Sequence, residues 1–423
     1  MKPKIILGLA LVLSGVLPGG YSVAHADIPR SVKPEYPLTQ PPEFDSIHMM
    51  NREIGWAQNV RATFRTNTWV FDDPAILRTT DGGKSWKYVL SASPENKMTP
   101  FFYDTNTAWV ASVLDEATNV VILKTTDGGR SWSKTHLQQT HPILDSFLAF
   151  PETHTGWLML IPDHGMNSSP GDLYRTDDGG TNWRRVNSTD GNPYEGDNYT
   201  SAVFETRHPY LLYSGPIAFQ NAATGWLWGS VASTTPGYLS ITRDGGLTWQ
   251  VQTLPLPSSL HDGRIEPIGL PHFFQMGGQD GIIGAEFWPA DNASTNFYTV
   301  IYNTHDSGLN WQPTTPVKSR GVWDFISAHQ GWLWSVEAHS TGSTAPVKGT
   351  LYRTDDGGTS WKPVKAEKNL EEYLTHGEDI VQLDFVDEEY GWAIARDRHN
   401  LTQLLQTVDG GKTWNIVQMK IQP

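Results

Sequence analysis

The sequence predicts an all-β protein, a single seven-bladed β-propeller of four-stranded antiparallel blades. Three observations lead to this prediction: an octapeptide recurs seven times, a Gly-Trp pair precedes most of its copies, and turn-forming and aromatic residues are abundant. The 423 residues include 39 Gly, 28 Pro and 18 Trp. Glycine and proline mark turns, so this composition is typical of a chain with many short strands.

Residues 1–26 have the pattern of a secretory signal peptide. Lys2 and Lys4 supply the positive start, an apolar run follows, and Ala24 and Ala26 occupy small-x-small cleavage positions. The apolar run of about 13 residues is too short to span a bilayer, which takes about 20. We therefore expect cleavage, a protein secreted to the bacterial cell surface and no membrane span after cleavage, with an uncleaved anchor as the alternative. Residues 27–43 then form a Pro-rich N-terminal segment.

The octapeptide reads Thr-x-Asp-x-Gly-x-(Ser/Thr/Asn)-Trp, and its copies lie 46 to 66 residues apart. The Thr and Asp side chains can bond to the backbone of their own turn, and the glycine permits a positive φ. The Trp can fill the gap between neighbouring blades. Identical turns in every repeat predict architecture, since a catalytic site is needed only once; the alternative is that the aspartates bind calcium or catalyse. The aspartates are Asp81, Asp127, Asp178, Asp244, Asp306, Asp356 and Asp409.

A Gly-Trp pair such as Gly391-Trp392 lies upstream of most octapeptides, and a short run ending in an aromatic residue or Met precedes it. The fifth repeat has Gly281-Ile282-Ile283-Gly284 in this place, without Trp. Each repeat thus holds four short apolar runs: an inner strand, the Gly-Trp strand, and the strands that enter and leave the octapeptide. Four strands at a period near 50 indicate propeller blades over residues 44–421, and closing the ring removes exposed sheet edges.

The octapeptide resembles the Asp-box, or bacterial neuraminidase repeat. With the Gly-Trp strand and seven copies, residues 44–421 resemble the photosystem II stability and assembly factor type of propeller, which implies a non-enzymatic protein-binding role. The Asp-box also occurs in sialidases, xyloglucan hydrolases and sortilin-type receptors, so the resemblance decides the fold and not the function. Sialidases carry an Arg in a Phe/Tyr-Arg-Ile-Pro motif near the first blade, and the strand expected at 44–49 has none.

Composition excludes several functions. The net charge is −14, and no Lys or Arg cluster indicates nucleic-acid binding. The absence of cysteine excludes disulfides, cysteine-zinc sites and thiol nucleophiles. The 14 histidines show no metal-ligand spacing. We expect a monomer without metal or cofactor.

Two kinds of connection are long, and both belong to the face opposite the octapeptide turns. They are the segments between the Gly-Trp and third strands, such as residues 61–74, and those between blades, such as 251–266. Long loops are more often functional than minimal ones, although neutral insertion is the alternative. Trp69, in the first of these loops, and Trp323 are candidate binding aromatics. Trp228 and Trp334 follow a Gly-Trp by two residues, which predicts core positions.

The inner strands should line a central channel. Asp324 and Asp384 lie in neighbouring blades, so their carboxyls could be about 5–10 Å apart, as glycoside hydrolysis requires; the alternative is ordinary polar lining of a solvated channel. The remaining binding candidates on or beside the inner strands are His48, His272, Arg264, Glu266 and Arg320.

These observations favour an exported, non-enzymatic binding or assembly module that engages a protein or cell-surface glycan on its long-loop face. The alternatives are a glycoside hydrolase, sialidase- or xyloglucanase-like, and a structural surface protein.

Overall fold

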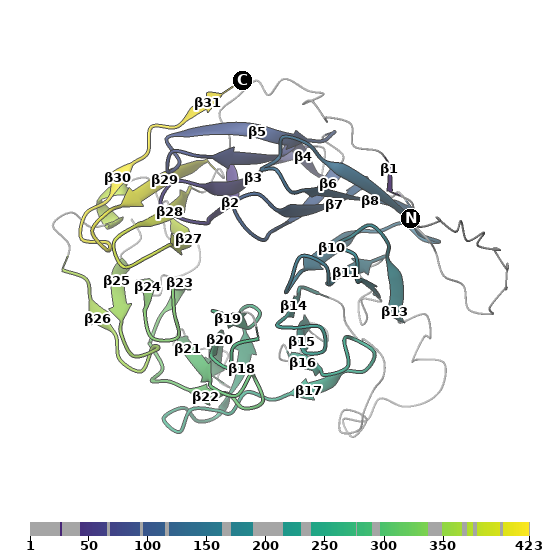
Figure 1. Ribbon diagram of the computed structural model, residues 1–423. Helices are drawn as coiled ribbons and strands as arrows, with labels where there is room; N and C mark the ends of the chain where they lie inside the picture. Colours follow the sequence, from purple (N-terminus) through teal and green to yellow (C-terminus); the bar gives the residue numbers. More distant parts are fainter. Residues whose placement is uncertain are drawn as a thin grey trace, which may run out of the picture.

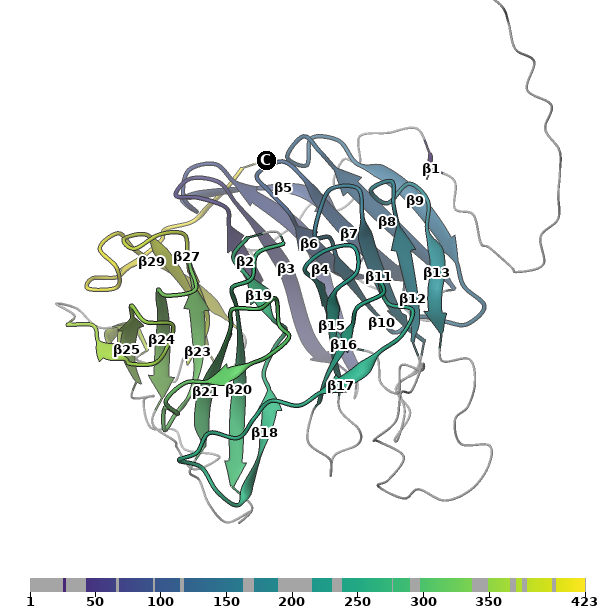
Figure 2. The same ribbon diagram turned by 60° about the horizontal axis from the view of Figure 1, so that its bottom comes forward.

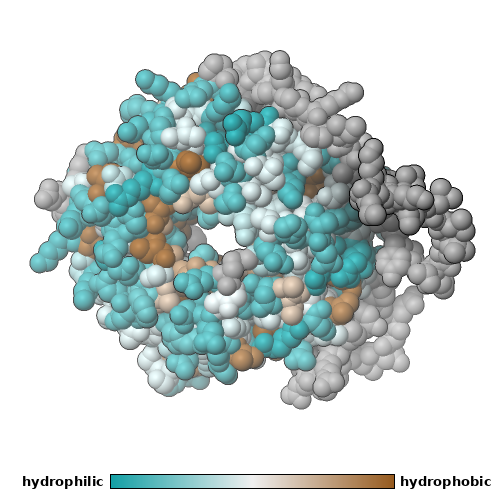
Figure 3. Space-filling model, in the orientation of Figure 1, coloured by the Kyte–Doolittle hydropathy of each residue, from teal (hydrophilic) through white to brown (hydrophobic). Residues whose placement is uncertain are grey.

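The computed structural model describes residues 26–27, 43–65, 68–93, 96–114, 118–162, 171–188, 215–229, 238–275, 277–289, 297–336, 349–365, 370–374, 379–397 and 401–422. They form seven sheets set in a ring around a central channel, antiparallel except for one added edge strand. This arrangement confirms the predicted seven-bladed propeller (Figures 1 and 3). The expected signal peptide up to residue 25 and residues 28–42 of the Pro-rich segment lie outside the described residues and stay predictions. No helix within the described ranges has the length and apolar character needed to cross a membrane.

The first two blades each carry one additional strand at the outer edge. In blade 1, β31 pairs with β5 in parallel, and in blade 2, β1 pairs with β9 antiparallel. Blade 1 consists of β2 (Phe44–Met49), β3 (Gly55–Arg65), β4 (Thr68–Thr79), β5 (Ser85–Ser91) and β31 (Lys420–Gln422). Blade 2 consists of β6 (Asn96–Phe102), β7 (Ala108–Leu114), β8 (Asn119–Thr125), β9 (Ser133–Gln138) and β1 (Ala26–Asp27).

Blades 3 and 4 have the plain four-stranded order. Blade 3 consists of β10 (Asp145–Ala149), β11 (Gly156–Ile161), β12 (Asp172–Thr176) and β13 (Arg184–Ser188). Blade 4 consists of β14 (Ile217–Phe219), β15 (Gly225–Gly229), β16 (Tyr238–Thr242) and β17 (Gln250–Gln252).

Blade 5 differs because its inner strand is split into β18 and β19, which both pair with β20. Blade 5 consists of β18 (Gly263–Pro267), β19 (His272–Phe273), β20 (Gly281–Pro289), β21 (Tyr298–Thr304) and β22 (Gln312–Pro313). Blade 6 consists of β23 (Arg320–Phe325), β24 (Gly331–Val336), β25 (Gly349–Thr354) and β26 (Lys362–Pro363). Blade 7 consists of β27 (Asp379–Phe385), β28 (Gly391–Arg396), β29 (Thr402–Thr407) and β30 (Asn415–Ile416), preceded by a 3-10 turn, η2 (Leu370–Tyr373).

The expected loop at residues 61–74 is instead an extended hairpin. β3 and β4 pair as far as Arg65 opposite Thr68, so residues 66–67 alone separate them. The interpretation of this segment as a loop was wrong because its β-branched and aromatic residues suit a strand. Of the two tryptophans expected in the core, Trp334 is buried and Trp228 is only half-buried.

The tryptophans of the Gly-Trp strands bind each blade to the next. The Trp109 ring stacks on Phe150 of blade 3 at 3.8 Å between centroids, and its Nε1 donates to the carbonyl of Gly179 in the same blade at 2.9 Å. The Trp332 ring of blade 6 stacks in the same way on Phe385 of blade 7, also at 3.8 Å. Aromatic stacking and a satisfied indole N–H thus recur at blade interfaces.

Polar side chains close the ring between blade 7 and blade 1. Gln382 brackets the backbone of Ile47, since its Oε1 accepts from the N–H at 3.0 Å and its Nε2 donates to the carbonyl at 2.6 Å. Arg52 forms ion pairs with Asp387 at 2.6 Å and Glu389 at 3.1 Å. Because β31 follows blade 7 in sequence and pairs with blade 1, the chain itself also crosses this seam.

Candidate functional site

The Asp-box carboxylates are occupied within their own turns. In blade 1, Asp81 Oδ1 accepts hydrogen bonds from the Thr79 hydroxyl at 2.9 Å and the Ser85 N–H at 2.8 Å, and Oδ2 accepts from the Ser85 hydroxyl at 2.6 Å. Thr79 in turn accepts the N–H of Gly83 at 2.9 Å. The other six turns repeat this arrangement, with Asn in place of Ser or Thr in blades 3 and 5.

This hydrogen bonding keeps the Asp-box carboxylates ionised. Partial burial of Asp81 favours its neutral form, but the hydrogen bonds from Ser85 and Thr79 outweigh burial and lower its pKa. The same balance lowers the pKa of the other six aspartates, Asp127, Asp178, Asp244, Asp306, Asp356 and Asp409. A carboxylate with this many internal donors has little capacity left for a ligand.

The sequence analysis did not predict a role for the residue immediately before the Asp-box threonine, which makes contacts within and between blades. Arg78 places its guanidinium 5.4 Å from the Trp56 ring, and its Nη2 donates to the carbonyl of Thr105 in the next blade at 2.7 Å. Arg175 does the same over Trp157 at 5.1 Å. Four of the seven repeats carry Arg or Lys here, a signal that was visible in the sequence. Each guanidinium thus lies over a tryptophan of its own blade and donates a hydrogen bond to the backbone of the next blade.

The inner strands place seven equivalent residues around the channel. Each lies opposite the first tryptophan of the second strand or, in blade 5, opposite Ile282. Blades 2 to 4 have apolar residues at this position, whereas blades 5, 6, 7 and 1 have titratable ones. The seven, from blade 1 onward, are His48, Phe101, Ala149, Ala218, His272, Asp324 and Asp384. The strand register therefore gathers four of the predicted site residues on one arc of the channel wall.

The two channel aspartates bind the backbone of the next blade. Asp324 Oδ2 accepts the N–H of Phe385 at 2.5 Å, and Asp384 Oδ2 accepts the N–H of Met49 at 2.6 Å. Burial raises the pKa of both to about 7, and for Asp324 the charge of Asp384 adds to this effect. These carboxyls lie in neighbouring blades, as expected, but each already has a structural partner.

The two channel histidines favour the neutral form. His48 and His272 expose surface to the channel, yet the surrounding protein walls disfavour a charge there. Burial lowers the pKa of both, and His48 lowers that of His272 further. The His272 ring also packs edge-on against Phe274 at 4.9 Å. Among the described residues, no group of three or more His, Asp or Glu side chains is arranged to hold a metal ion.

A second group of residues meets at the long-loop end of blade 5, and two of its members, Arg264 and Glu266, were predicted. We call it the blade 5 cluster: Arg264, Glu266, Glu286, Trp288 and Phe297. Arg264 pairs with Glu266 at 2.8 Å and lies opposite Trp288, with its guanidinium 5.5 Å from that ring. Glu266 lies opposite Glu286 across the two strands, and Phe297 meets Trp288 edge-on at 4.9 Å. β18 starts and β20 ends at this edge of the blade, at the bottom of Figure 2.

The three remaining candidates are placed as follows. Trp323 is half-buried and packs over Gly284 of β20, where a Cβ would lie 2.5 Å from its ring, so it fills the interface between blades 5 and 6. Trp69 has its backbone in β4, and Arg320 begins β23 opposite Val336. The side chains of Trp69 and Arg320 lie outside the described residues.

One family model matches part of the chain. Residues 60–196, about a third of the chain, match the family model described as Photosynthesis system II assembly factor YCF48. No curated protein matches the chain.

Among solved structures, an ulvan lyase of a polysaccharide lyase family, bound to -[GlcA(1-4)Rha3S]-, is 11% identical with a TM-score of 0.49, covering 86% of this chain and 91% of that one. A prolyl endopeptidase is 8% identical with a TM-score of 0.48, covering 93% and 49%. The Aleuria aurantia lectin is 10% identical with a TM-score of 0.37, covering 76% and 96%. By its own seven sheets the chain is a seven-bladed β-propeller, and its residues 60–196 are similar to the photosystem II assembly factor family.

Proposed function

We propose that the protein is an exported, non-enzymatic binding or assembly module that engages a protein or cell-surface glycan on its long-loop face. The observation that carries this proposal is the blade 5 cluster. Arg264 is 42% exposed and Glu266 is 23% exposed, so both present hydrogen-bonding groups to solvent beside aromatic rings. Partly exposed aromatic and arginine side chains are the residue types that anchor partners at binding surfaces.

The alternative function, glycoside hydrolysis by Asp324 and Asp384, has one observation in its favour. Both carboxyls have a pKa near 7, which is typical of a general acid. Against it, each carboxyl accepts a backbone N–H of the next blade, an arrangement that serves blade contact. We therefore favour binding.

The test is capture of a partner with the purified protein and its Arg264→Ala variant. The immobilised protein is exposed to a glycan array and to cell-surface extract, and affinity is then measured for the captured partner. Loss of the guanidinium and its pair with Glu266 should weaken binding about tenfold, on the order of 1.4 kcal/mol. Binding to the glycan array would identify a glycan partner, and capture of a protein from the extract would identify a protein partner.

The matched control is Arg184→Ala, which removes an arginine of similar exposure, 48%, that pairs with Asp177 on the Asp-box side of blade 3. Binding should be unchanged in this control. Equal affinities for both variants would show that the blade 5 cluster is not the contact surface. Turnover of any glycan, lost in Asp324→Asn, would favour the hydrolase instead.

A further inference from the structure

Seven apolar cores, one between each pair of neighbouring blades, hold the ring together, and one of them is much smaller than the rest. Among the described residues, six of these cores contain from 8 to 13 buried side chains. The core between blades 5 and 6 contains three, Ile282, Ile301 and Phe325, and we call this contact the 5/6 interface. Because burial of apolar surface is the dominant stabilising contribution where blades pack, we expect this interface to be the weakest of the seven.

The small core follows from the sequence of blade 5. In each of the other six blades, a tryptophan of the second strand packs against the inner strand of the next blade, as Trp332 does on Phe385 at 3.8 Å between centroids. Blade 5 has Ile282 at this position, so Phe325 of blade 6 receives no tryptophan from blade 5. Isoleucine buries less apolar surface than tryptophan, and its side chain has no N–H to donate to the next blade.

Two tryptophans of blade 6 fill the 5/6 interface only in part. Trp323 lies over Gly284 of β20, and Trp361 of the Asp-box turn meets Phe325 edge-on at 5.9 Å between centroids. Both tryptophans are half-buried, whereas the Asp-box tryptophans of the other six blades are buried. Aromatic surface that is closed to solvent at the equivalent position of the other blades is therefore partly accessible at this one.

Hydrogen bonds connect blades 5 and 6 at two ends of the interface. At the Asp-box end, Asn303 Nδ2 donates to the carbonyl of Gly357 at 2.9 Å. At the long-loop end, Thr299 of β21 and Val317 of the segment leading into blade 6 exchange two backbone hydrogen bonds of 2.9 Å. Since the long-loop end also contains the covalent connection between the blades, it can serve as a hinge while the small core parts.

We propose that the ring opens at the 5/6 interface, by a hinge motion about the segment at Val317 that separates Ile282 and Ile301 from Phe325. His272 and Asp324 are the channel residues on either side of this interface, so opening gives a second route to the channel wall between them. The motion requires no partner, and the proposal is therefore independent of the binding function proposed for the blade 5 cluster.

The test measures the rate at which iodoacetamide alkylates single buried cysteines, because the chain has no cysteine of its own. Ile301→Cys places a thiol in the 5/6 interface, and Ile122→Cys places one at the same repeat position between blades 2 and 3. Both native side chains are 2% exposed. At about pH 8, where part of the thiol is ionised, we expect alkylation at least about tenfold faster in Ile301→Cys. Equal rates would overturn the proposal.

Val300→Cys distinguishes opening of the interface from unfolding of blade 5. Val300 is the neighbour of Ile301 on β21 but packs in the core between blades 4 and 5. Opening at the 5/6 interface leaves the thiol of Val300→Cys as protected as that of Ile122→Cys, whereas unfolding of blade 5 exposes positions 300 and 301 alike. Equally fast alkylation of Val300→Cys and Ile301→Cys would therefore contradict the proposal.

A second measurement keeps the test decisive if a cysteine weakens the whole fold. Low concentrations of urea accelerate alkylation steeply where it requires global unfolding and only slightly where it requires local opening. Ile301→Cys should show the shallow dependence, and so should Ile282→Cys, a second probe in the same interface. A steep dependence in both would show that the blades part only when the chain unfolds.

The interface can also be loosened further. Trp323→Leu removes the ring that covers Gly284 and should raise the alkylation rate of Ile301→Cys severalfold, while the rate of Ile122→Cys stays unchanged. An equal rise in both cysteine variants would mean that the tryptophan stabilises the chain as a whole, and no rise in either would mean that Trp323 does not hold the joint closed.

Discussion

The Asp of the Asp-box turn and the channel-lining residue of the inner strand each occupy one position that recurs in all seven blades. The first position is the same residue in every blade, whereas the second differs between blades. Every Asp-box has the same Asp with the same internal bonds and a lowered pKa. The equivalent channel position holds His, Phe, Ala or Asp, and its two aspartates have a raised pKa. A position whose partners lie in its own turn can be copied from blade to blade, whereas a position that faces its neighbours is free to differ. Individual function is therefore to be sought where the blades differ.

The largest effect should come from breaking an Asp-box turn. Asp81→Ala removes the acceptor of three hydrogen bonds and leaves partly buried donors unsatisfied, which should cost about 2–4 kcal/mol in the free energy of unfolding. Urea denaturation at pH 7 measures this. Glu152→Ala, which removes an equal charge from an exposed position, should cost less than about 0.5 kcal/mol. Equal effects would mean that the turn does not depend on its carboxylate.

The next effect is on the pH dependence of stability, which should differ between the channel aspartates and the Asp-box aspartates. The unfolded pKa of an Asp is about 3.9, and Asp384 has a folded pKa of about 7, so between these values the folded state binds the extra proton. Its contribution to stability therefore falls as pH rises from about 4 to about 7. Asp384→Asn keeps an oxygen for the Met49 N–H and should flatten this decline by about 1–3 kcal/mol between pH 5 and pH 8.

The control is the same substitution in the other region, Asp81→Asn. The folded pKa of Asp81 lies below its ordinary value, so its stabilising charge is fully present above pH 5 and is lost only as pH falls through that lowered pKa. Asp81→Asn should therefore lower stability by the same amount at pH 5 and pH 8. If both variants shift the pH profile alike, the two regions do not differ electrostatically in the way we describe.

The smallest expected effect on stability concerns the one Asp-box turn that departs from the glycine pattern. The first of the two central turn positions is glycine at positive φ in six Asp-boxes, but in blade 5 Ser307 adopts φ 60°. Ser307→Gly should relieve this left-handed conformation and raise the melting temperature, with a gain of about 0.5–1 kcal/mol. A loss of stability would mean that the serine hydroxyl, which donates to the carbonyl of Gly278 at 3.4 Å, matters more than the backbone strain.

The sequence predicted those features whose contacts join residues close together in the chain, and it did not predict those whose contacts join distant residues. Thr79, Asp81 and Ser85 bond within four residues of one another, so the octapeptide alone predicted the turns and, through their number, the ring. Asp384 and Met49 are 335 residues apart, and no local pattern predicts that hydrogen bond. The strand register, which fixed the channel ring, depends on exact strand ends, and these were misplaced at residues 61–74.

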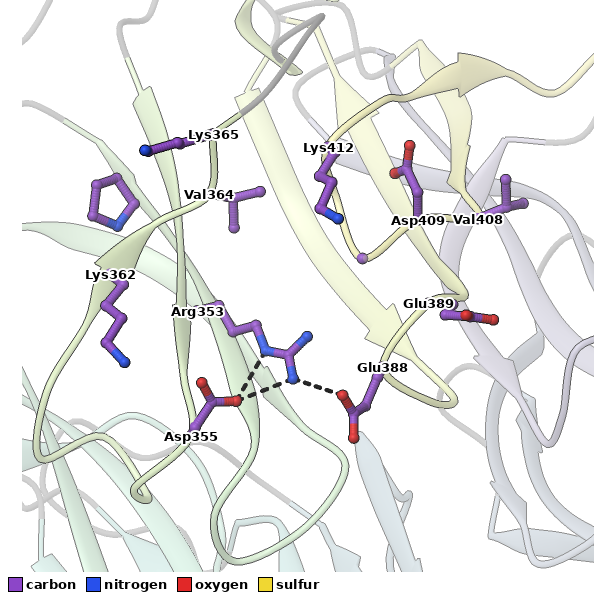
Figure 4. Close-up of a pocket in the computed structure, with 12 residues that line it drawn as sticks. Arg353, Asp355, Lys362, Val364, Lys365, Glu388, Glu389, Val408, Asp409 and Lys412 are labelled. Carbon is purple, nitrogen blue, oxygen red and sulfur yellow. Dashed lines mark hydrogen bonds and ion pairs between the residues drawn. The ribbon is translucent and has the colours of Figure 1, made fainter.

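The blade 5 cluster was predicted in part. Arg264 and Glu266 were predicted as binding candidates because they are charged and lie beside an inner strand. Trp288 and Glu286 join them only through pairing with β20. A hollow of about 460 Å³ between blades 6 and 7 was not predicted, because its lining residues come from two blades and meet only in the folded arrangement (Figure 4).

The last strand of the chain, β31, overlaps the first blade of the ring by pairing with β5. Starting from blade 1, the polypeptide makes more than one full circuit, and Lys420 donates its backbone N–H to the Lys84 carbonyl at 3.0 Å once blade 1 is reached again. The three residues of β31 therefore add backbone pairing to a seam that the side chains of Gln382 and Arg52 also hold together. Opening of the ring between blades 7 and 1 would require release of this strand as well as of those side-chain contacts.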